Sequence, residues 1–452
     1  MATRVSRTST LGSLTTWTWS GWVKRGKVSS GSHTLFASIT DGNNYTQCYI
    51  DSGDDFRFLN YVSSSTTGAL TTDRKFRDPG AWYHIVVNWD SSNASAGDRI
   101  RLYVNGVEET SFSTDTQPGS SDPSDMNKSG AVTSMGGHTL ASEDFYGELS
   151  HCHFIDGTIY GPTTFGEFDT TSGIWKPKTA PSVTYGTNGW FLKFEDRTNL
   201  DLDSGTNAFT FTTTGTLTAT YDSPSNNFCT MNPLNNMGGS SPTFSNGNNT
   251  YLQGGTSQYF PGAGTMGLEA GLWYWECSFT SGNAALLGVA GDASIATNMA
   301  GSANQYLGWS ALQWALYVET GVYYNGTTGT SYGVAVAADD IIGVYLDLTA
   351  NKLYFAKDGV IMNSGTGISI TAAASTSAGY YIPSASYWGS NTTFKFNFGN
   401  GYLGTTAVTS AVADAGGIGA FEYDPSDGGA SSFDSSAKDF RAICTKNIAT
   451  YG

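Results

Sequence analysis

At 452 residues the chain is longer than one hydrophobic core usually serves, and roughly 150 residues per domain predicts two or three domains. Glycine is abundant (56 residues) and only 13% of residues are charged, which disfavours helices and favours short strands joined by tight turns. The formal net charge of −16 argues against nucleic acid and anionic lipid as partners, because both attract clustered Lys and Arg.

The first 30 residues depart from this acidic balance. They contain no Asp or Glu and carry five cations, Arg4, Arg7, Lys24, Arg25 and Lys27. These residues are candidates for a face that docks an acidic partner. The plainer interpretation of the same residues is a solvated face.

The chain begins with a polar stretch, and no segment approaches the roughly 18 apolar residues of a membrane span. We therefore expect neither a secretory signal nor membrane insertion, and synthesis in a cytoplasm. The cysteines stand singly without a C-x-x-C motif, which disfavours a disulfide framework and a zinc site. We expect buried free thiols at Cys48, Cys152, Cys229, Cys277 and Cys444.

Strand patterns with a period of two fill the first part of the chain. Segments 16–25 and 55–62 alternate, and 82–90 is bulky on both faces, as is typical of a central strand. Segment 99–107 has one apolar face and ends in a turn at Asn105-Gly106. Many short strands separated by turn residues predict a β-sandwich.

Between about residues 176 and 258 the pattern loosens into a polar run of turn formers and prolines. Strands are still expected at 190–196 and 207–215, so we expect this connector to be ordered. The expected division is 1–178, a first β-sandwich; 179–258, an ordered connector with some strands; 259–403, a second β-sandwich; and 404–452, a C-terminal tail that packs back on the domains.

The second sandwich has its clearest element at 339–360, where alternating apolar residues lead through a turn into a return strand and then a second turn. Further strands are expected at 271–282, 285–292, 305–310, 313–326 and 392–403. The predicted fold class is therefore all-β, with two tandem antiparallel β-sandwiches.

Five motifs of the second domain resemble the SPRY domain, in the same order. They are G-x-W-Y-W-E (271–276), Y-Y-N-G (323–326), D-x-I-G-V-Y-L-D-L (340–348), L-Y-F-A-K-D-G (353–359) and F-N-F-G (396–399). The resemblance implies a bent β-sandwich that binds proteins through loops at one end, without catalysis. The shared motif residues are mostly core and turn residues, so they specify the fold rather than the ligand.

The first domain resembles the laminin-G-like, concanavalin A-like jelly rolls through W-S-G-W-V-K-R (19–25), W-Y-H-I-V-V (82–87) and R-L-Y-V-N-G (101–106). Other motifs resemble a group of marine bacteriophage virion surface proteins in which such a jelly roll is followed by a SPRY domain. They are Y-G-E-L-S-H-C-H-F-I-D-G (146–157), F-G-E-F (165–168), W-K-P-K (175–178), D-S-P-x-N-x-F-C-T-x-N-P-L (222–234) and F-R-A-I-C-T-K-N-I (440–448).

This resemblance implies a virion surface protein, made in the host cytoplasm and located on the tail, on a tail fibre or on the capsid. The function we expect from it is non-enzymatic host attachment, by receptor binding to a cell-surface glycan or protein. The alternative is capsid decoration. The expected partners are other virion proteins and the host receptor, a homo-oligomer remains open, and neither nucleic acid nor membrane insertion is expected.

Residue patterns for catalysis are missing from the sequence. Laminarinase-type relatives of the concanavalin A-like group use E-x-D-x-x-E on one strand, and this pattern does not occur. The adjacent pairs Glu195-Asp196 and Glu143-Asp144 would point to opposite faces of a strand. Neither a G-x-S-x-G elbow nor a G-x-x-x-x-G-K loop is present. We expect no catalytic residue; a glycan-cleaving depolymerase would need distant carboxylates that converge in the fold.

Two sets of residues suit a metal ion. His151 and His153 are two apart, so a strand would place both on one side, although no acidic third ligand is near and a structural role is simpler. Calcium is the one cofactor left open, because laminin-G-like sandwiches sometimes hold it at a loop rim. Its candidate ligands are Asp41, Asn43, Asn44, Asp51, Asp54 and Asp55, and all of these are also ordinary turn residues.

Aromatic residues in loops are the candidates for ligand contact, because sugar rings stack on Trp and Tyr. In the second domain these are Trp309, Trp314, Tyr323 and Trp388. Each of them suits a core equally well. Trp388 lies in the polar stretch 385–391 and is the one we expect to be exposed.

Overall fold

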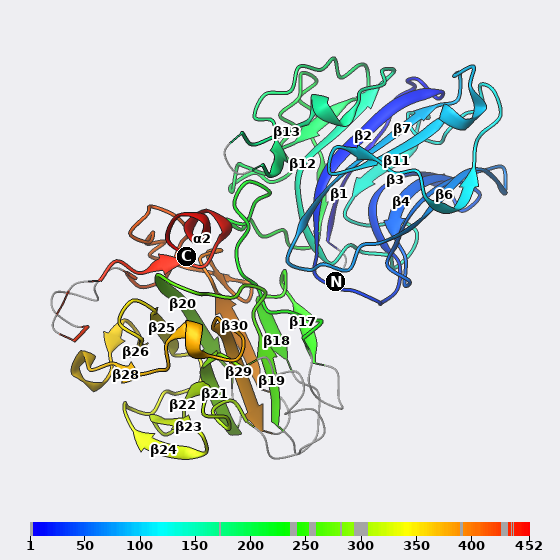
Figure 1. Cartoon of the computed structure of the whole chain (residues 1–452). Helices are drawn as coiled ribbons and strands as arrows, with labels where there is room; N and C mark the ends of the chain where they lie inside the picture. Colours follow the sequence, from blue (N-terminus) through cyan, green and yellow to red (C-terminus); the bar gives the residue numbers. More distant parts are fainter. Residues whose placement is uncertain are drawn as a thin grey trace. The chain divides into compact units, whose positions relative to one another are not determined.

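The computed structural model describes residues 3–452 apart from 171–172, 236–241, 253–258, 281–282, 293–305, 389–391, 426–432, 435 and 437. The chain divides into two compact units, Met1–Ala219 and Thr220–Gly452 (Figure 1). Strands dominate both units, and α2 (Thr445–Tyr451) is the one α-helix among the described residues. The predicted all-β class is confirmed. No described helix has the length and apolar character needed to cross a membrane.

Two antiparallel sheets form the first unit. The larger runs in the order β10 (Phe112–Thr116), β6 (Ser65–Lys75), β5 (Asp55–Val62), β4 (Asn44–Ile50), β3 (His33–Asp41), β11 (Val132–Met135), β1 (Arg4–Thr8) and β16 (Thr212–Thr214). The other runs in the order β15 (Trp190–Leu192), β12 (Gly147–Asp156), β2 (Thr16–Arg25), β7 (Trp82–Asp90), β8 (Ile100–Val104) and β9 (Val107–Glu108). A separate hairpin joins β13 (Gly166–Phe168) to β14 (Trp175–Pro177).

The apolar alternation explains the core of the first unit. β7 lies between β2 and β8, as its two bulky faces predict. On β8 the residues Ile100, Leu102 and Val104 are buried, and Asn105 and Gly106 form the expected turn with positive φ. All five cysteines of the chain are free and buried, which confirms that prediction.

Every histidine of the chain lies in the first unit, and burial is the largest cause that lowers the pKa of each. They are His33, His84, His138, His151 and His153. For His84 burial lowers the pKa to about 3. Its ring accepts a hydrogen bond from the Trp175 indole N–H (3.0 Å), which leaves the other ring nitrogen to donate to Ser20 Oγ (2.9 Å). The fold therefore holds a neutral imidazole.

We expect the first unit to lose stability as the pH falls below 6.5. An unfolded histidine takes up a proton near pH 6.5, whereas these folded ones resist until about pH 4 or below, so the unfolded state binds more protons in between. His33, His84 and His151 then each remove about 1.4 kcal/mol per pH unit from the free energy of unfolding.

A disulfide reagent that reacts in acid can follow this loss, since Cys48 and Cys152 report on the first unit and Cys277 on the second. The urea midpoint for labelling of the first unit should fall between pH 6.5 and pH 4.5. The second unit has no histidine, and protonation of its buried Glu276, whose pKa is raised to about 7, stabilises it over this range, so its midpoint should not fall. A parallel fall in both units would contradict the prediction.

The second unit also consists of two main sheets. The larger follows β17 (Thr243–Ser245), β18 (Thr250–Leu252), β30 (Thr393–Asn397), β20 (Leu272–Phe279), β25 (Ile341–Asp347), β26 (Lys352–Lys357) and β27 (Val360–Ile361), with β28 (Ile368–Ser369) beside β26 and β33 (Arg441–Ala442) beside β20. The smaller follows β19 (Tyr259–Ala263), β29 (Ile382–Trp388), β21 (Asn283–Ala290), β22 (Gln313–Tyr317), β23 (Val322–Asn325) and β24 (Thr328–Ser331). A short pair joins β31 (Tyr402–Leu403) to β32 (Thr406–Ala407).

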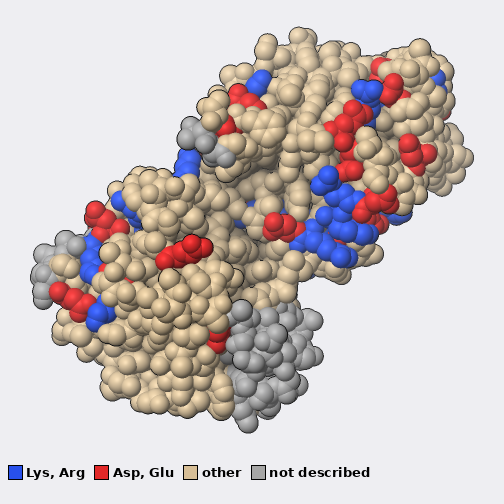
Figure 2. Space-filling model, viewed as in Figure 1, with Lys and Arg blue, Asp and Glu red and all other residues tan. Residues whose placement is uncertain are grey.

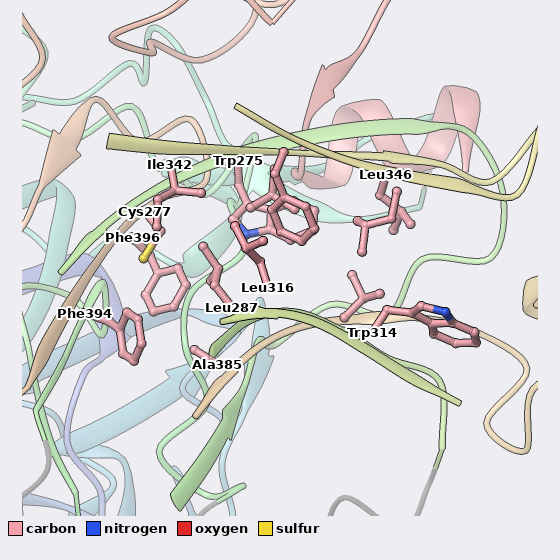
Figure 3. Close-up of a cluster of buried hydrophobic side chains, with 14 of the residues drawn as sticks. Trp275, Cys277, Leu287, Trp314, Leu316, Ile342, Leu346, Ala385, Phe394 and Phe396 are labelled. Carbon is pink, nitrogen blue, oxygen red and sulfur yellow. The ribbon is translucent and has the colours of Figure 1, made fainter. Parts of the chain in front are cut away.

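The core of this unit lies between its two sheets (Figure 3). Trp275 and Ile342 project from the larger sheet, and Leu287, Trp314 and Leu316 meet them from the smaller one. Strands β25 and β26 pair through the hairpin predicted for 339–360, and the alternate residues of β25 that were expected to face inward are buried.

The outward face of the larger sheet is covered by the end of the chain. Tyr274, Tyr345 and Tyr354 leave that face and are fully buried. Phe433 and Phe440 pack on Tyr345 and Tyr354, and Phe421 packs on Tyr274. The terminal strand β33 adds to β20 in parallel, with Arg441 beside Trp273. The described residues from 404 onward thus include a structural layer of the second unit.

Glu276 fixes this layer from beneath. Its side chain is fully buried and accepts hydrogen bonds from the backbone N–H groups of Glu422 (3.0 Å) and Tyr423 (2.8 Å), from Asn397 Nδ2 (3.0 Å) and from the Tyr274 hydroxyl (3.0 Å). Burial raises the pKa of Glu276 to about 7, and the backbone hydrogen bonds offset this only in part.

Candidate functional site

The smaller sheet of the second unit carries aromatic rings on its outward face. Because side chains alternate along a strand, residues beside the inward Leu287, Trp314 and Leu316 point out, and Tyr317 of β22 is one of them. Six such rings make one connected group, which we call the outer aromatic cluster: Tyr259, Tyr306, Trp309, Tyr317, Tyr324 and Trp388.

The rings of the cluster contact one another edge to face or in tilted pairs. Tyr259 lies 5.0 Å from Trp388 and 5.2 Å from Tyr306, measured between ring centroids. Tyr306 in turn meets Tyr324 at 5.5 Å and Trp309 at 5.5 Å, with the Trp309 ring perpendicular to it. Such pairs stabilise one another and hold each ring in a defined orientation.

A loop at 306–312 crosses this face and holds two of the rings. The Leu307 N–H donates to the buried Ser386 Oγ (2.9 Å), and the Gly308 N–H donates to Gln313 Oε1 (3.0 Å). Gly308 has φ +98°, and a Cβ there would lie 2.8 Å from the Tyr324 carbonyl oxygen, so only glycine fits. Residues 306–310 thus form this loop instead of the strand expected at 305–310, and residue 305 lies outside the described residues.

Leu307 explains why the loop stays against the sheet. Its side chain is fully buried against Leu286, Ala290 and Ala315, which are the outward residues of β21 and β22. Trp309, two residues later, is 40% exposed. The loop therefore presents an exposed ring from a fixed base.

The structure separates the four aromatic candidates into two faces. Trp309 and Trp388 belong to the outer aromatic cluster, and Trp388 is partly exposed. Trp314 is 5% exposed and packs against Tyr381 in the inner core, and Tyr323 packs against that core beside Tyr332. Trp314 and Tyr323 are therefore structural.

Sequence reasoning missed the other four rings of the cluster. Tyr317 and Tyr324 had a local signal, since each lies one residue out of register with the apolar row of its own strand. Tyr259 and Tyr306 had none, because they reach the cluster through long-range packing of β19 and the 306–312 loop.

The expected docking face of the first unit is not a row of exposed cations. Lys24 and Arg25 are 2% and 1% exposed and so contribute no surface charge. The Arg4 guanidinium lies 4.0 Å from the Asp144 carboxylate. The two remaining cations lie over aromatic rings, Arg7 over Phe209 and Lys27 over Tyr146.

The candidate calcium ligands have other partners in this fold. Asp54 is buried and bound by Arg25 (2.7 Å) and Arg77 (2.8 Å), which neutralise its carboxylate. Asp55 pairs with Lys75 (2.6 Å). Asp51 caps the turn to β5 and lies 3.4 Å from Arg57.

The other set of candidate calcium ligands, Asp41, Asn43 and Asn44, lies in a turn at the end of β3. Asp41 Oδ1 accepts hydrogen bonds from the Asn43 N–H (2.8 Å) and from Asn44 Nδ2 (3.0 Å). The described part of the chain contains no group of three His, Cys, Asp or Glu side chains placed for a metal ion. These residues do not fit a calcium site as they stand, and calcium stays a prediction of the sequence.

The His151 and His153 pair does not share one regular strand face. A bulge interrupts β12 between Ser150 and His153, and His151 has φ 47°. His153 stacks on Phe191 at 3.8 Å and bonds the Tyr185 hydroxyl at 3.0 Å. The pair thus has the structural role that the sequence favoured.

Comparison with known families finds one match within each unit. Residues 3–159 match the family model of the concanavalin A-like lectin/glucanases superfamily, and residues 272–401 match that of the SPRY domain. A search of curated proteins found no match.

Solved structures show similarity to about a third of the chain. The SPRY domain of human HERC1 is 17% identical, with 37% of this chain and 96% of that chain covered and a TM-score of 0.27. Stonustoxin is 17% identical, with 37% and 27% covered and a TM-score of 0.28. A heptameric SAP-like pentraxin from Limulus polyphemus is 18% identical, with 35% and 72% covered and a TM-score of 0.26.

Proposed function

We propose that this chain, which contains a concanavalin A-like domain followed by a SPRY domain, is a non-enzymatic attachment protein of a bacteriophage virion. Its SPRY unit binds a ligand on the host surface through the outer aromatic cluster. The observation that carries the proposal is that six connected aromatic rings stand on the outward face of a sheet, with Trp309 40% exposed.

The contrast between the two sheets supports this use of the cluster. Both sheets have tyrosines on their outward faces, but on the larger sheet the chain covers Tyr274, Tyr345 and Tyr354 completely. On the smaller sheet the 306–312 loop leaves Tyr259, Tyr317 and Tyr324 only partly buried. Aromatic rings held at a surface typically bind a partner, because they bury large area with little loss of conformational entropy.

The cluster supports binding rather than catalysis. The residues that compose it are tyrosines and tryptophans; in the described part of the chain, Glu319 is the carboxylate that adds to burial in raising the pKa of Tyr259 and Tyr317. A hydrolase of the glycan-cleaving kind needs a pair of carboxyl groups about 5–10 Å apart. Glu319 accepts hydrogen bonds from the Ala285 N–H (3.1 Å), which assigns it a role in shaping the sheet.

The virion location rests on the resemblance of the motifs at 146–157, 222–234 and 440–448 to marine phage surface proteins. Many copies on one particle would turn a weak single contact into firm attachment by multivalency. Capsid decoration would need a basic or apolar docking face, for which the region around Arg4 to Lys27 is the candidate; the burial of Lys24 and Arg25 weakens this candidate and so favours attachment.

Cell attachment by protein-coated fluorescent beads tests the proposal. Changing Trp309 to Ala should lower bead attachment to host cells by more than tenfold, because an exposed ring at the centre of a contact typically contributes about 2 kcal/mol or more. The change should leave thermal stability nearly intact, since Trp309 is 40% exposed.

Phe168→Ala is the matched control, because Phe168 is an exposed aromatic residue (60%) of the other unit. Equal attachment by the wild type and Trp309→Ala would refute the binding role of the cluster. Proteomics of purified particles tests the location separately, and absence of the chain from them would refute the virion assignment.

A further inference from the structure

The smaller sheet of the second unit carries no positive charge. Neither Lys, Arg nor His occurs anywhere in residues 198–351 or 358–394, and these ranges contain every strand of that sheet and the 306–312 loop. In Figure 2 the part of the unit that holds β22, β23 and β24 is correspondingly tan, without blue. An anionic ligand would find no counter-charge at the outer aromatic cluster.

The cluster is polar in a second way, through its hydroxyl groups. Tyr259, Tyr306, Tyr317 and Tyr324 are each partly exposed, and no hydrogen bond within the described residues joins their hydroxyls to another group. Burial raises the pKa of Tyr259 to about 12, and the neighbouring Tyr317 and Tyr306 add to this effect. The hydroxyls therefore keep their protons at neutral pH and both donate and accept hydrogen bonds.

Glu319 supplies a carboxylate at the edge of the sheet that carries the outer aromatic cluster. Glu319 lies two residues after Tyr317, the last residue of β22, and accepts a hydrogen bond from the Ala285 N–H of β21, so its carboxylate lies at the end of β22 beside β21. Burial is the main cause of the raised pKa of Tyr317 and of Tyr259, and Glu319 adds to both. It would repel a carboxylate, sulfate or phosphate group on a ligand. A ligand rich in hydroxyl groups would instead find an acceptor there.

We infer that the outer aromatic cluster binds an uncharged saccharide and discriminates against acidic glycans. A neutral sugar ring offers an apolar C–H face to stack on Trp309 and Tyr306, and hydroxyls that match the free phenol groups and Glu319. This inference rests on the proposed attachment function and specifies its ligand class.

Titration of the full chain with paired oligosaccharides tests the inference. Each pair shares one backbone of neutral hexoses or N-acetylhexosamines, with one member carrying sialic acid, a uronic acid or sulfate. We expect the neutral member to bind and the acidic member to bind at least about tenfold more weakly, with Trp309→Ala weakening the neutral member by about tenfold or more. Phe168→Ala should change nothing.

The Glu319→Gln variant tests the contribution of the negative charge of Glu319, because it removes this charge and keeps the size of the side chain. Glutamine keeps an oxygen that can accept the Ala285 N–H hydrogen bond, so the sheet should retain its shape. We expect binding of the neutral member to stay within about threefold and the gap to the acidic member to narrow by about threefold or more. Preferred binding of the acidic member, or an unchanged gap in Glu319→Gln, would overturn the inference.

The two proposals fail in different ways. If Trp309→Ala abolishes cell attachment but neutral oligosaccharides neither bind nor compete with the cells, then the ligand class is wrong and attachment stands. If neutral oligosaccharides bind in a Trp309-dependent way while Trp309→Ala beads still attach normally, then the saccharide site stands and the attachment function is wrong.

Discussion

Removing the C-terminal layer from residue 404 onward is expected to unfold the second unit rather than shorten it. The truncation would expose the fully buried Tyr274, Tyr345 and Tyr354 and remove Phe433 and Phe440 from above them. It would also leave the buried Glu276 without its bonds from the N–H groups of Glu422 and Tyr423. A buried group that loses its partners costs about 1–3 kcal/mol, and more when it is charged. The total exceeds the stability of a typical domain.

Phe440→Ala examines the same layer without deleting it. Because Phe440 is fully buried among Tyr345, Tyr354 and Phe433, we expect a loss of about 3–5 kcal/mol in the free energy of unfolding. Denaturant unfolding, with labelling of Cys277 as the readout for the second unit, measures it. Labelling of Cys48 in the first unit should not change. A loss below about 1 kcal/mol would show that the layer is dispensable.

Breaking the buried ion pair of the first unit is expected to be as costly. Arg25 and Asp54 have no exposed side-chain surface and meet at 2.7 Å, and Arg25 Nη1 also donates to the Phe76 carbonyl (2.6 Å). Burial alone would raise the pKa of Asp54, but hydrogen bonds from the Ser29 N–H, Arg77 and Arg25 lower it to about 2. The pair is therefore charged at neutral pH.

Asp54→Asn leaves Arg25 buried without a counter-charge, and such a change typically costs about 3–5 kcal/mol. Asparagine tolerates the positive φ of this position (67°), so backbone strain is not the cause. The double variant Arg25→Met with Asp54→Asn should recover part of the loss, because no unpaired charge remains. Urea unfolding of Asp54→Asn, Arg25→Met and the double variant measures the loss of stability in each. A loss in the double variant equal to the sum of the two single losses would contradict an ion-pair role.

Local pattern in the sequence predicted the architecture well because the strands alternate. Residues 82–90 and 339–360 carry enough bulky side chains to identify a central strand and a hairpin, and both occur as β7 and β25–β26. Pattern alone did not decide which face of a strand is covered. Tyr323 and Tyr324 are adjacent and chemically identical, and only the packing of β23 in the fold turns the second outward.

The burial of charged residues was harder to predict from the sequence than that of apolar residues, because Lys and Arg are normally expected at the surface. Lys24 and Arg25 end β2, a strand with neighbours on both sides, and this position buries them. The partner that makes the burial of Arg25 tolerable, Asp54, lies 29 residues further along the chain in the turn before β5. No short-range pattern links the two residues, so their pairing required the fold.

The parallel pairing of β33 with β20 also means that the larger sheet of the second unit cannot be completed until the last strand of the chain has been synthesised. The pairing of Trp273 with Arg441 cannot form until Arg441 has been synthesised. At about 5–20 residues per second, synthesis of the stretch between them takes roughly ten to thirty seconds. The first unit also pairs distant strands, since β1 pairs with β16, but all its strands lie within residues 4–214 and are therefore synthesised before β20. On the ribosome the first unit can thus fold before the second is complete, while a sheet face rich in tyrosine stays open to chaperones or to misassembly until its covering layer emerges.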